Sequence, residues 1–440
     1  MSQFTSQIST QMSPVDTFNK FDNDHFFHKF RVFGKYLLLY FFIAQTSMPF
    51  FVSDIYLYVG FVISFLLFVY KREKVDAFII VYSLIYFSIF MAQVYWFSVN
   101  EPNIILGYFF RIIYAYTTIK IIGEKILDYY INIIYFFSVL AVIIFIPYLF
   151  YQEQFDEFFT RISEYISPFQ LASPGRDHII VYTYGVGYED ADGETAKNLI
   201  RNSGPFWEPG GFGVFITIAF FFEMIKKNKF ITKKNVVFII ALLSTLSTGS
   251  FFVFFLIVLS YIIINPTLLR VCLLIGFLIL STFVYSKIFF LSEKVNNQSS
   301  YNYSLKYAPR SRFVCAQLDW NDFVNNPILG RGRFLATRFD IKEDEEHTYM
   351  NHRNNGTTNL LVEFGFFGFV AFFYYMYQSF ALLCKRYKAK IQYAFVFTMI
   401  VVALGFSQKI FQKPFFIGLS FMFLAAIPKN EVDNLNDENG

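Results

Sequence analysis

Arginine, glutamate and histidine side chains gather in two polar segments of an otherwise apolar chain. The first segment, residues 151–205, leads through Arg201 and a Gly-Pro pair into Glu208-Pro209. A guanidinium beside the start of an apolar helix is a good anion-binding site. Glu208 could accept a proton from a substrate or cap that helix. The alternative for Arg201 is that it only anchors the helix at the membrane surface.

The second segment, residues 291–357, contains basic side chains that could bind a diphosphate. They are Arg310, Arg312, Arg331, Arg333, His352 and Arg353. Arginine is suited to bidentate contact with phosphate, and a histidine can act as a general base near neutral pH. The alternatives are that the arginines pair with Asp319, Asp322 and the acidic run 343–346, and that the histidine is an ordinary loop residue.

Charged residues inside the apolar runs are few. Glu363 lies within an expected membrane span, where a carboxylate is costly and usually functional. Arg111 lies close enough to the outer end of its span to reach the surface. The acidic stretch 190–194 resembles a metal site, but nothing supplies the sheet of a nucleotide-sugar transferase. We therefore predict no metal site and no cofactor.

The composition indicates a polytopic membrane protein. The chain has 440 residues, of which 55% are hydrophobic and only 16% are charged, whereas soluble domains have about 25% charged residues. Apolar runs of about 17–25 residues are long enough to cross a hydrocarbon core about 30 Å thick. They lack the short alternating strands of an outer-membrane barrel. We expect an all-α protein with about 12 transmembrane helices.

Basic residues indicate the orientation in the membrane. Clusters near residues 29–31, 71–74, 226–234, 270 and 385–390 fall on one face if there are twelve spans, and the positive-inside rule makes that face cytoplasmic. Lys409 and Lys413 are the exceptions. Both long polar segments are then periplasmic loops, so ATP and cytosolic nucleotide sugars are excluded as direct co-substrates. The charge of +4 follows this topology and does not indicate nucleic acid.

The expected organisation alternates tails, membrane bundles and loops. It comprises a cytoplasmic tail rather than a signal peptide at 1–32, helices 1–5 at 33–150, a periplasmic loop at 151–205, helices 6–9 at 206–290, a second periplasmic loop at 291–357, helices 10–12 at 358–428 and a cytoplasmic tail at 429–440. Cys272, Cys315 and Cys384 form no motif, and we expect no intramolecular disulfide.

Three stretches resemble, in order, the motifs of the O-antigen polymerase and ligase superfamily. The first runs from Arg201 to Gly213. The second is Arg312 followed by Pro-Ile-Leu-Gly-Arg-Gly at 327–332, and the third is Asn-Asn at 354–355 followed by Glu-Phe-Gly-Phe-Phe-Gly at 363–368. A Ser-Thr-Gly-Ser turn at 247–250 lies where the family often has Ser-Arg-Gly. The resemblance covers about residues 201–380.

The resemblance implies a metal-independent, inverting glycosyltransferase with a GT-C-like architecture in the bacterial inner membrane. Its donor and acceptor would be glycans linked to undecaprenyl pyrophosphate, with a chain-length regulator protein as a further possible partner. Arg201 and Arg312 would neutralise the leaving pyrophosphate, and His352 or Glu208 would accept the proton. Arg310, Arg331, Arg333, Arg353, Asn354 and Glu363 would bind substrate, with Glu363 supporting the base of the loop.

One departure from the family pattern separates two activities. Asn354 stands where ligases carry a histidine, and His352 lies two residues earlier. This difference favours a polymerase of O-antigen repeat units over a ligase that transfers finished glycan to lipid A–core. A lipid-linked oligosaccharide flippase, another alternative, should have its polar residues inside the membrane, where this chain has few. A structural scaffold would need no ordered arginine motifs.

Overall fold

The computed structural model describes residues 14–99, 101–166, 177–189, 195–196, 200–287, 311–339 and 353–425. The membrane-region helices are α1 (Pro14–Ser47), α2 (Asp54–Tyr70), α3 (Ala77–Phe97), α4 (Pro102–Ile122), α5 (Ile126–Tyr148), α7 (Pro209–Lys227), α8 (Lys233–Ser244), α9 (Thr248–Ile264), α10 (Leu268–Lys287), α14 (Gly356–Arg386), α15 (Gln392–Ser407) and α16 (Pro414–Gly418). Short 3₁₀ helices are η1 (Pro49–Phe51), η2 (Gly123–Lys125) and η5 (Leu419–Ala425).

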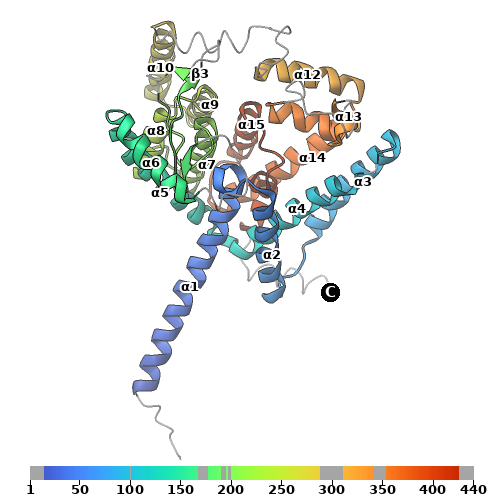
Figure 1. Ribbon diagram of the computed structural model, residues 1–440, viewed down its shortest axis with the longest axis horizontal. Coiled ribbons are helices and arrows are strands. Elements are labelled where there is room, and N and C mark those ends of the chain that lie inside the picture. The colour runs from blue at the N-terminus through green and yellow to red at the C-terminus, as the bar shows by residue number, and fades with distance from the viewer. Residues whose placement is uncertain are drawn as a thin grey trace, which may run out of the picture.

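The two long polar segments contain their own short elements. The first has the helix α6 (Gln152–Ile166) and two antiparallel hairpins, β1 (His178–Ile179) with β2 (Tyr182–Thr183) and β3 (Tyr188–Glu189) with β4 (Thr195–Ala196). The second has α12 (Arg312–Asn325) and α13 (Leu335–Phe339). In Figure 1, α12, α13 and β3 all lie toward the upper end of the helices.

The mostly helical structure is consistent with the predicted all-α membrane protein. Among the described residues, four stretches are long and apolar enough to cross a membrane, namely Ala77–Phe97, Pro102–Tyr148, Pro209–Lys227 and Gly356–Arg386. The second contains both α4 and α5, which Gly123 separates with its positive φ of 67°. Each predicted span overlaps a helix, but α8 has only 12 residues and is about 18 Å long. It is too short to cross the hydrocarbon core alone, so the number twelve stays a prediction.

The first helix begins earlier than the sequence suggests. α1 starts at Pro14, inside the segment predicted as a polar tail, and its first half extends away from the other helices (Figure 1). Its second half is buried, with Leu39, Phe42 and Ile43 fully enclosed. The apolar face of a long helix therefore begins well after the helix itself.

The core of the protein surrounds α7. This helix is buried from Gly211 to Ile225 and packs against α5, α8, α9 and α15. Phenylalanine rings fill the contacts; the rings of Phe215 and Phe206 stack with centroids 4.6 Å apart. Such stacking adds to the dispersion energy of a tightly packed interior. The start of α7 is consequently held in a fixed position, and the candidate site is built around it.

Candidate active site

Glu208 immediately precedes α7, and its carboxylate contacts two other parts of the chain. Pro209 is the first residue of the helix, where a missing N–H costs little. The Glu208 Oε1 accepts a hydrogen bond from Nε2 of Gln408, just after α15. The same oxygen lies 3.9 Å from Nη2 of Arg312, at the start of α12. The carboxylate therefore links the starts of α7 and α12 to the end of α15.

Glycines in the first turn of α7 let neighbouring segments approach it. A Cβ atom on Gly213 would lie 2.0 Å from Oγ of Ser250, in the first turn of α9, and one on Gly211 would lie 2.9 Å from Oγ of Ser47. Neither position has room for a side chain. These glycines therefore permit the close approach of α9 and of the end of α1 to the start of α7.

Arg312 connects the two polar segments. Its Nη1 donates a hydrogen bond of 3.2 Å to the main-chain oxygen of Asn354, just before α14. In return, Nδ2 of Asn355 donates to the main-chain oxygen of Arg312 at 3.4 Å. Burial lowers the pKa of the Arg312 guanidinium, while the nearby Glu208 carboxylate raises it. A guanidinium titrates so far above neutrality that it stays positively charged here.

The helix α14 is broken at Gly365, where φ is 64° and ψ is −172°. The loop between α12 and α13 packs into this break. The main-chain N–H of Arg331 donates to the oxygen of Val362 at 2.7 Å, and that of Phe366 donates to the oxygen of Pro327 at 2.8 Å. Two of the motifs recognised in the sequence thus form one backbone structure, joined by hydrogen bonds that an unbroken helix would not offer.

Glu363 is buried just before this break, and its carboxylate lies close to three other side chains. Its Oε1 accepts hydrogen bonds from Nδ2 of Asn359 at 2.7 Å and from Nε2 of Gln412. Its Oε2 lies 3.8 Å from Nε of Arg333, and the Arg333 guanidinium lies over the ring of Tyr108, 5.4 Å from its centroid. Glu363 thus contacts α14, the connection after α15 and the loop between α12 and α13; its role in supporting the base of the loop stays a prediction.

Two aspartates of α12 bind several arginines of the second segment. Arg338 lies 2.5 Å from Asp319 and 2.5 Å from Asp322. Arg353 lies 3.3 Å from Asp319, and Arg331 lies 3.6 Å from Asp322. Asp319 is completely buried. Ion pairs with aspartates were the alternative role considered for these arginines, and Arg331 and Arg353 form such pairs. These ion pairs orient α12 against the start of α14.

Arg201 contacts the end of α8. Its main-chain N–H donates to the oxygen of Val186 at 3.0 Å, and its Nε donates to the oxygen of Thr245 at 3.3 Å. The next residue, Asn202, is buried and donates through Nδ2 to Oγ of Ser244 at 2.9 Å. Arg201 is thus next to the end of α8, whereas Arg312 is next to Glu208 at the start of α7.

The sequence analysis missed the contribution of the connection between α15 and α16. This connection contains Gln408 and Gln412. It also contains Lys409 and Lys413, the two basic residues that do not follow the positive-inside pattern. Burial lowers the pKa of Lys409, and the Glu363 carboxylate raises it. Burial and the positive charge of Arg111 lower the pKa of Lys413, while Asp54 raises it. Two lysines on the face that the other basic residues avoid were a signal in the sequence that could have identified this connection.

Gln93 of α3 was also missed. Its Nε2 donates to the main-chain oxygens of Leu329 at 2.6 Å and of Glu363 at 2.8 Å. It therefore holds together the two backbone segments that meet at the break in α14. A single glutamine in an apolar span carries little signal in a sequence.

Some predicted residues lie outside the part of the chain that the structure describes. These are Arg310, His352 and the acidic stretch 190–194. Among the described residues, no group of three or more His, Cys, Asp or Glu side chains could hold a metal ion. The three cysteines are free thiols.

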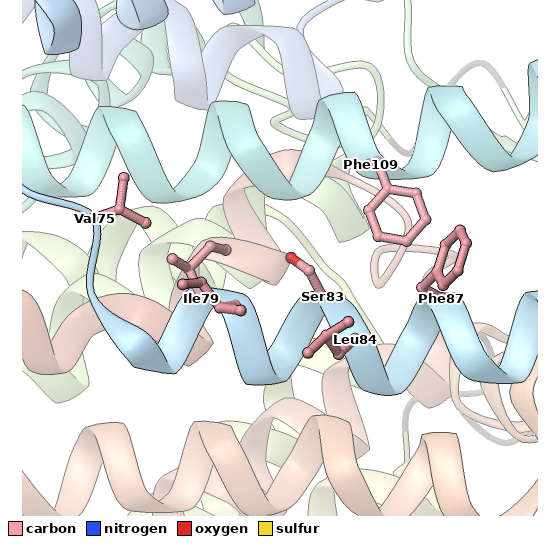
Figure 2. Close-up of a pocket in the computed structure, with 7 residues that line it drawn as sticks. Val75, Ile79, Ser83, Leu84, Phe87 and Phe109 are labelled. Atoms are coloured by element: carbon pink, nitrogen blue, oxygen red, sulfur yellow. The ribbon is translucent and has the colours of Figure 1, made fainter.

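An apolar groove lies between α3 and α4. Figure 2 shows residues of α3, including Ser83, Leu84 and Phe87, together with Phe109 of α4. The groove has a volume of about 350 Å³, and its lining begins at Val75, in the connection before α3.

Residues 235–373 match the family described as O-Antigen ligase. The match covers the second and third of the sequence motifs and confirms the resemblance to the O-antigen polymerase and ligase superfamily. It supports a glycosyl-transferring function of the ligase or polymerase type and does not support a flippase. Neither the curated proteins nor the solved structures provide a match to this chain.

Proposed function

Given a membrane protein that matches the O-antigen ligase family over residues 235–373, we propose that it polymerises O-antigen repeat units. The donor and the acceptor are oligosaccharides linked to undecaprenyl pyrophosphate, and transfer occurs at the periplasmic face of the inner membrane. The observation that carries this proposal is the position of Arg312. Its guanidinium lies between the carboxylate of Glu208 and the main chain of Asn354, where the two long polar segments meet.

The reaction is a single displacement at the anomeric carbon of the donor sugar. A hydroxyl oxygen of the acceptor forms the new glycosidic bond as the bond to the pyrophosphate oxygen breaks, which inverts the configuration. The bonding electrons leave with the pyrophosphate, and the hydroxyl proton goes to a base. Arginines that neutralise the charge developing on the leaving group stabilise the transition state. This role needs no metal ion.

The residues have distinct roles in this mechanism. Arg201, next to the end of α8, and Arg312, next to the start of α7, bind the pyrophosphate, with the N-terminus of α7 adding a favourable dipole. Glu208 is adjacent to Arg312 and is the candidate base among the described residues. His352 is the second candidate base.

The remaining predicted residues surround the pyrophosphate site. Arg333 lies beside Glu363 and is positioned to contact the glycan or the second pyrophosphate. Arg331, Arg353 and Asn354 act chiefly by placing α12 and the start of α14, because carboxylates or main-chain contacts already occupy them. Arg310, in the segment before α12, would act together with these residues.

The undecaprenyl chain of a substrate needs an apolar surface that leads to the site. The groove between α3 and α4 is lined mainly by aliphatic and aromatic residues (Figure 2). Burying isoprenyl groups there would contribute about 0.8 kcal/mol per CH₂. We assign the lipid of one substrate to this groove.

The distinction between polymerase and ligase rests on Asn354. A carboxamide cannot accept a proton near neutral pH, and the main-chain oxygen of Asn354 already accepts from Arg312. A ligase that depends on a histidine at this position would therefore lack its base. The ligase, which transfers finished glycan to lipid A–core, remains the competing proposal because the matching family carries that description.

Deletion of the gene separates these proposals in a host that makes a core-linked glycan. Without the polymerase, an independent ligase still transfers one unpolymerised unit, so gels of lipopolysaccharide should show core with a single repeat unit. Without the ligase, the core is bare and long polymer accumulates on the undecaprenyl carrier. Bare core with carrier-linked polymer would refute the polymerase and establish the ligase. Complementation of the deletion strain with Asn354→His tests whether the side chain at this position alone decides between polymerase and ligase activity.

A further inference from the structure

A second groove lies between α9, α10 and the connection from α7 to α8, far along α7 from the candidate site. It has a volume of about 1020 Å³. Its lining residues come from these three elements and include Phe230, Phe254, Val258, Ile262, Arg270 and Cys272. No role in the proposed glycosyl transfer falls to these residues.

The walls of this groove are apolar. Phe254, Val258 and Ile262 are spaced four residues apart on α9, so they form one continuous stripe along the helix. Phe230, in the connection between α7 and α8, completes the apolar wall, with its ring centroid 4.8 Å from that of Tyr261. Such a surface would gain free energy by covering an acyl chain.

The end of the groove is positively charged. The Arg270 guanidinium lies 5.1 Å from the centroid of the Tyr261 ring, and its Nη1 donates to the main-chain oxygen of Asn265 at 2.6 Å. These contacts fix the arginine while leaving further N–H donors for a ligand. Lys229 adds a second, exposed cation. The described residues that line the groove include no acidic side chain.

We propose that this groove binds an anionic phospholipid, with its phosphate against Arg270 and Lys229 and an acyl chain against the stripe on α9. A basic pocket between membrane helices, on the face that carries the basic connections, is suited to an anionic headgroup. The start of α7, next to Arg312, is the opposite end of that helix. The occupant is therefore a phospholipid rather than the lipid-linked glycan.

Cys272 provides a direct test, because this thiol lines the groove and is exposed, whereas Cys315 and Cys384 are buried. The full-length protein would be placed in nanodiscs of phosphatidylcholine, with or without palmitoyl-oleoyl phosphatidylglycerol, and its labelling by a maleimide would be timed. Cys272→Ser gives the background. We expect phosphatidylglycerol to slow labelling several-fold.

Charge variants identify the binding groups. In Lys229→Gln/Arg270→Gln the concentration of phosphatidylglycerol needed for protection should rise about 10- to 30-fold, at about 1 kcal/mol for each basic residue. Arg270→Lys should retain most of the protection. The matched control Lys71→Gln/Arg72→Gln removes two charges at the end of α2 and should behave as wild type.

Three results would overturn the proposal. Equal labelling of the wild type in both nanodiscs would show no selective binding. Protection by a polyprenyl diphosphate but not by phosphatidylglycerol would assign the groove to the substrate lipid. Unchanged protection in the folded double variant would exclude the two cations. None of these readouts depends on the glycosyl-transfer assay.

Discussion

Gly330 and Gly365 contact each other backbone to backbone. A Cβ atom on Gly330 would lie 2.5 Å from the main-chain nitrogen of Gly365, and one on Gly365 would lie 2.6 Å from the nitrogen of Gly330. Both residues have positive φ angles, of 70° and 64°. Two motifs that are more than thirty residues apart in the sequence therefore depend on each other for their conformation.

Replacing either glycine with alanine should destabilise the protein. A left-handed conformation costs an alanine about 1–2 kcal/mol, and the close contact adds about 1–3 kcal/mol. Thermal unfolding of the detergent-solubilised protein measures the loss. Gly34→Ala is the matched control, because nothing lies within 4 Å of the Cβ position on α1. Equal melting temperatures for Gly365→Ala and Gly34→Ala would contradict this account of the break in α14.

Arg201→Ala and Arg312→Ala should each abolish most polymer formation while the protein level in the membrane stays normal. Loss of one donor to a developing anion costs about 10²–10³ in rate. Lysine at either position should restore only part of the activity, because it cannot form the bidentate contact. Chain formation from purified lipid-linked repeat units provides the rate.

The control for these variants is Arg161→Ala in α6. Arg161 is an exposed arginine of the same polar segment as Arg201, and it forms an ion pair with Glu157 at 2.5 Å. It should keep full activity. Full activity in Arg201→Ala or Arg312→Ala as well would remove that arginine from the site.

Glu208→Gln should separate a base from a structural carboxylate. Glutamine keeps the size of the side chain and an oxygen that can accept from Gln408, but it cannot take up the proton. If Glu208 is the base, kcat falls at least 100-fold with little change in KM, and the acidic limb of the pH–rate profile disappears. The same behaviour in His352→Ala, with Glu208→Gln active, would move the base to His352.

Raising the pH should weaken substrate binding through Lys413. Burial lowers the pKa of its amine, and Arg111 lowers it further, so the positive charge is lost at a lower pH than in a free lysine. If that charge holds the second pyrophosphate, KM rises as the pH rises through this lowered pKa. Lys413→Arg stays charged and should keep a low KM to higher pH. An identical alkaline rise in both proteins would exclude Lys413 from substrate binding.

Reporter fusions test the topology on which the whole site depends. Fusions at Glu189 and Glu345 should report the periplasm, and one at Asn228 should report the cytoplasm. The reason is that the basic connections share one face of the membrane. A cytoplasmic signal from either long segment would place the arginines on the wrong side for a lipid-linked donor.

Local patterns in the sequence determined the membrane class and the order of the helices. Long apolar runs form helices wherever they occur, since a membrane requires each backbone N–H and C=O to be paired within the segment. The predicted spans accordingly overlap helices from α1 to η5. Arg201, Arg312 and Glu208 were also identifiable, because they stand in ordered motifs that resemble those of a known family.

Only the tertiary structure decided how these residues are used. In the folded protein, Arg331 and Arg353 pair with aspartates of α12, whereas Arg312 lies between Glu208 and Asn354. The tertiary structure also brought Gln408 and Gln412 to the carboxylates of Glu208 and Glu363. Such contacts join positions up to 200 residues apart. They depend on how helices pack in space, which the periodicity of a single segment does not encode.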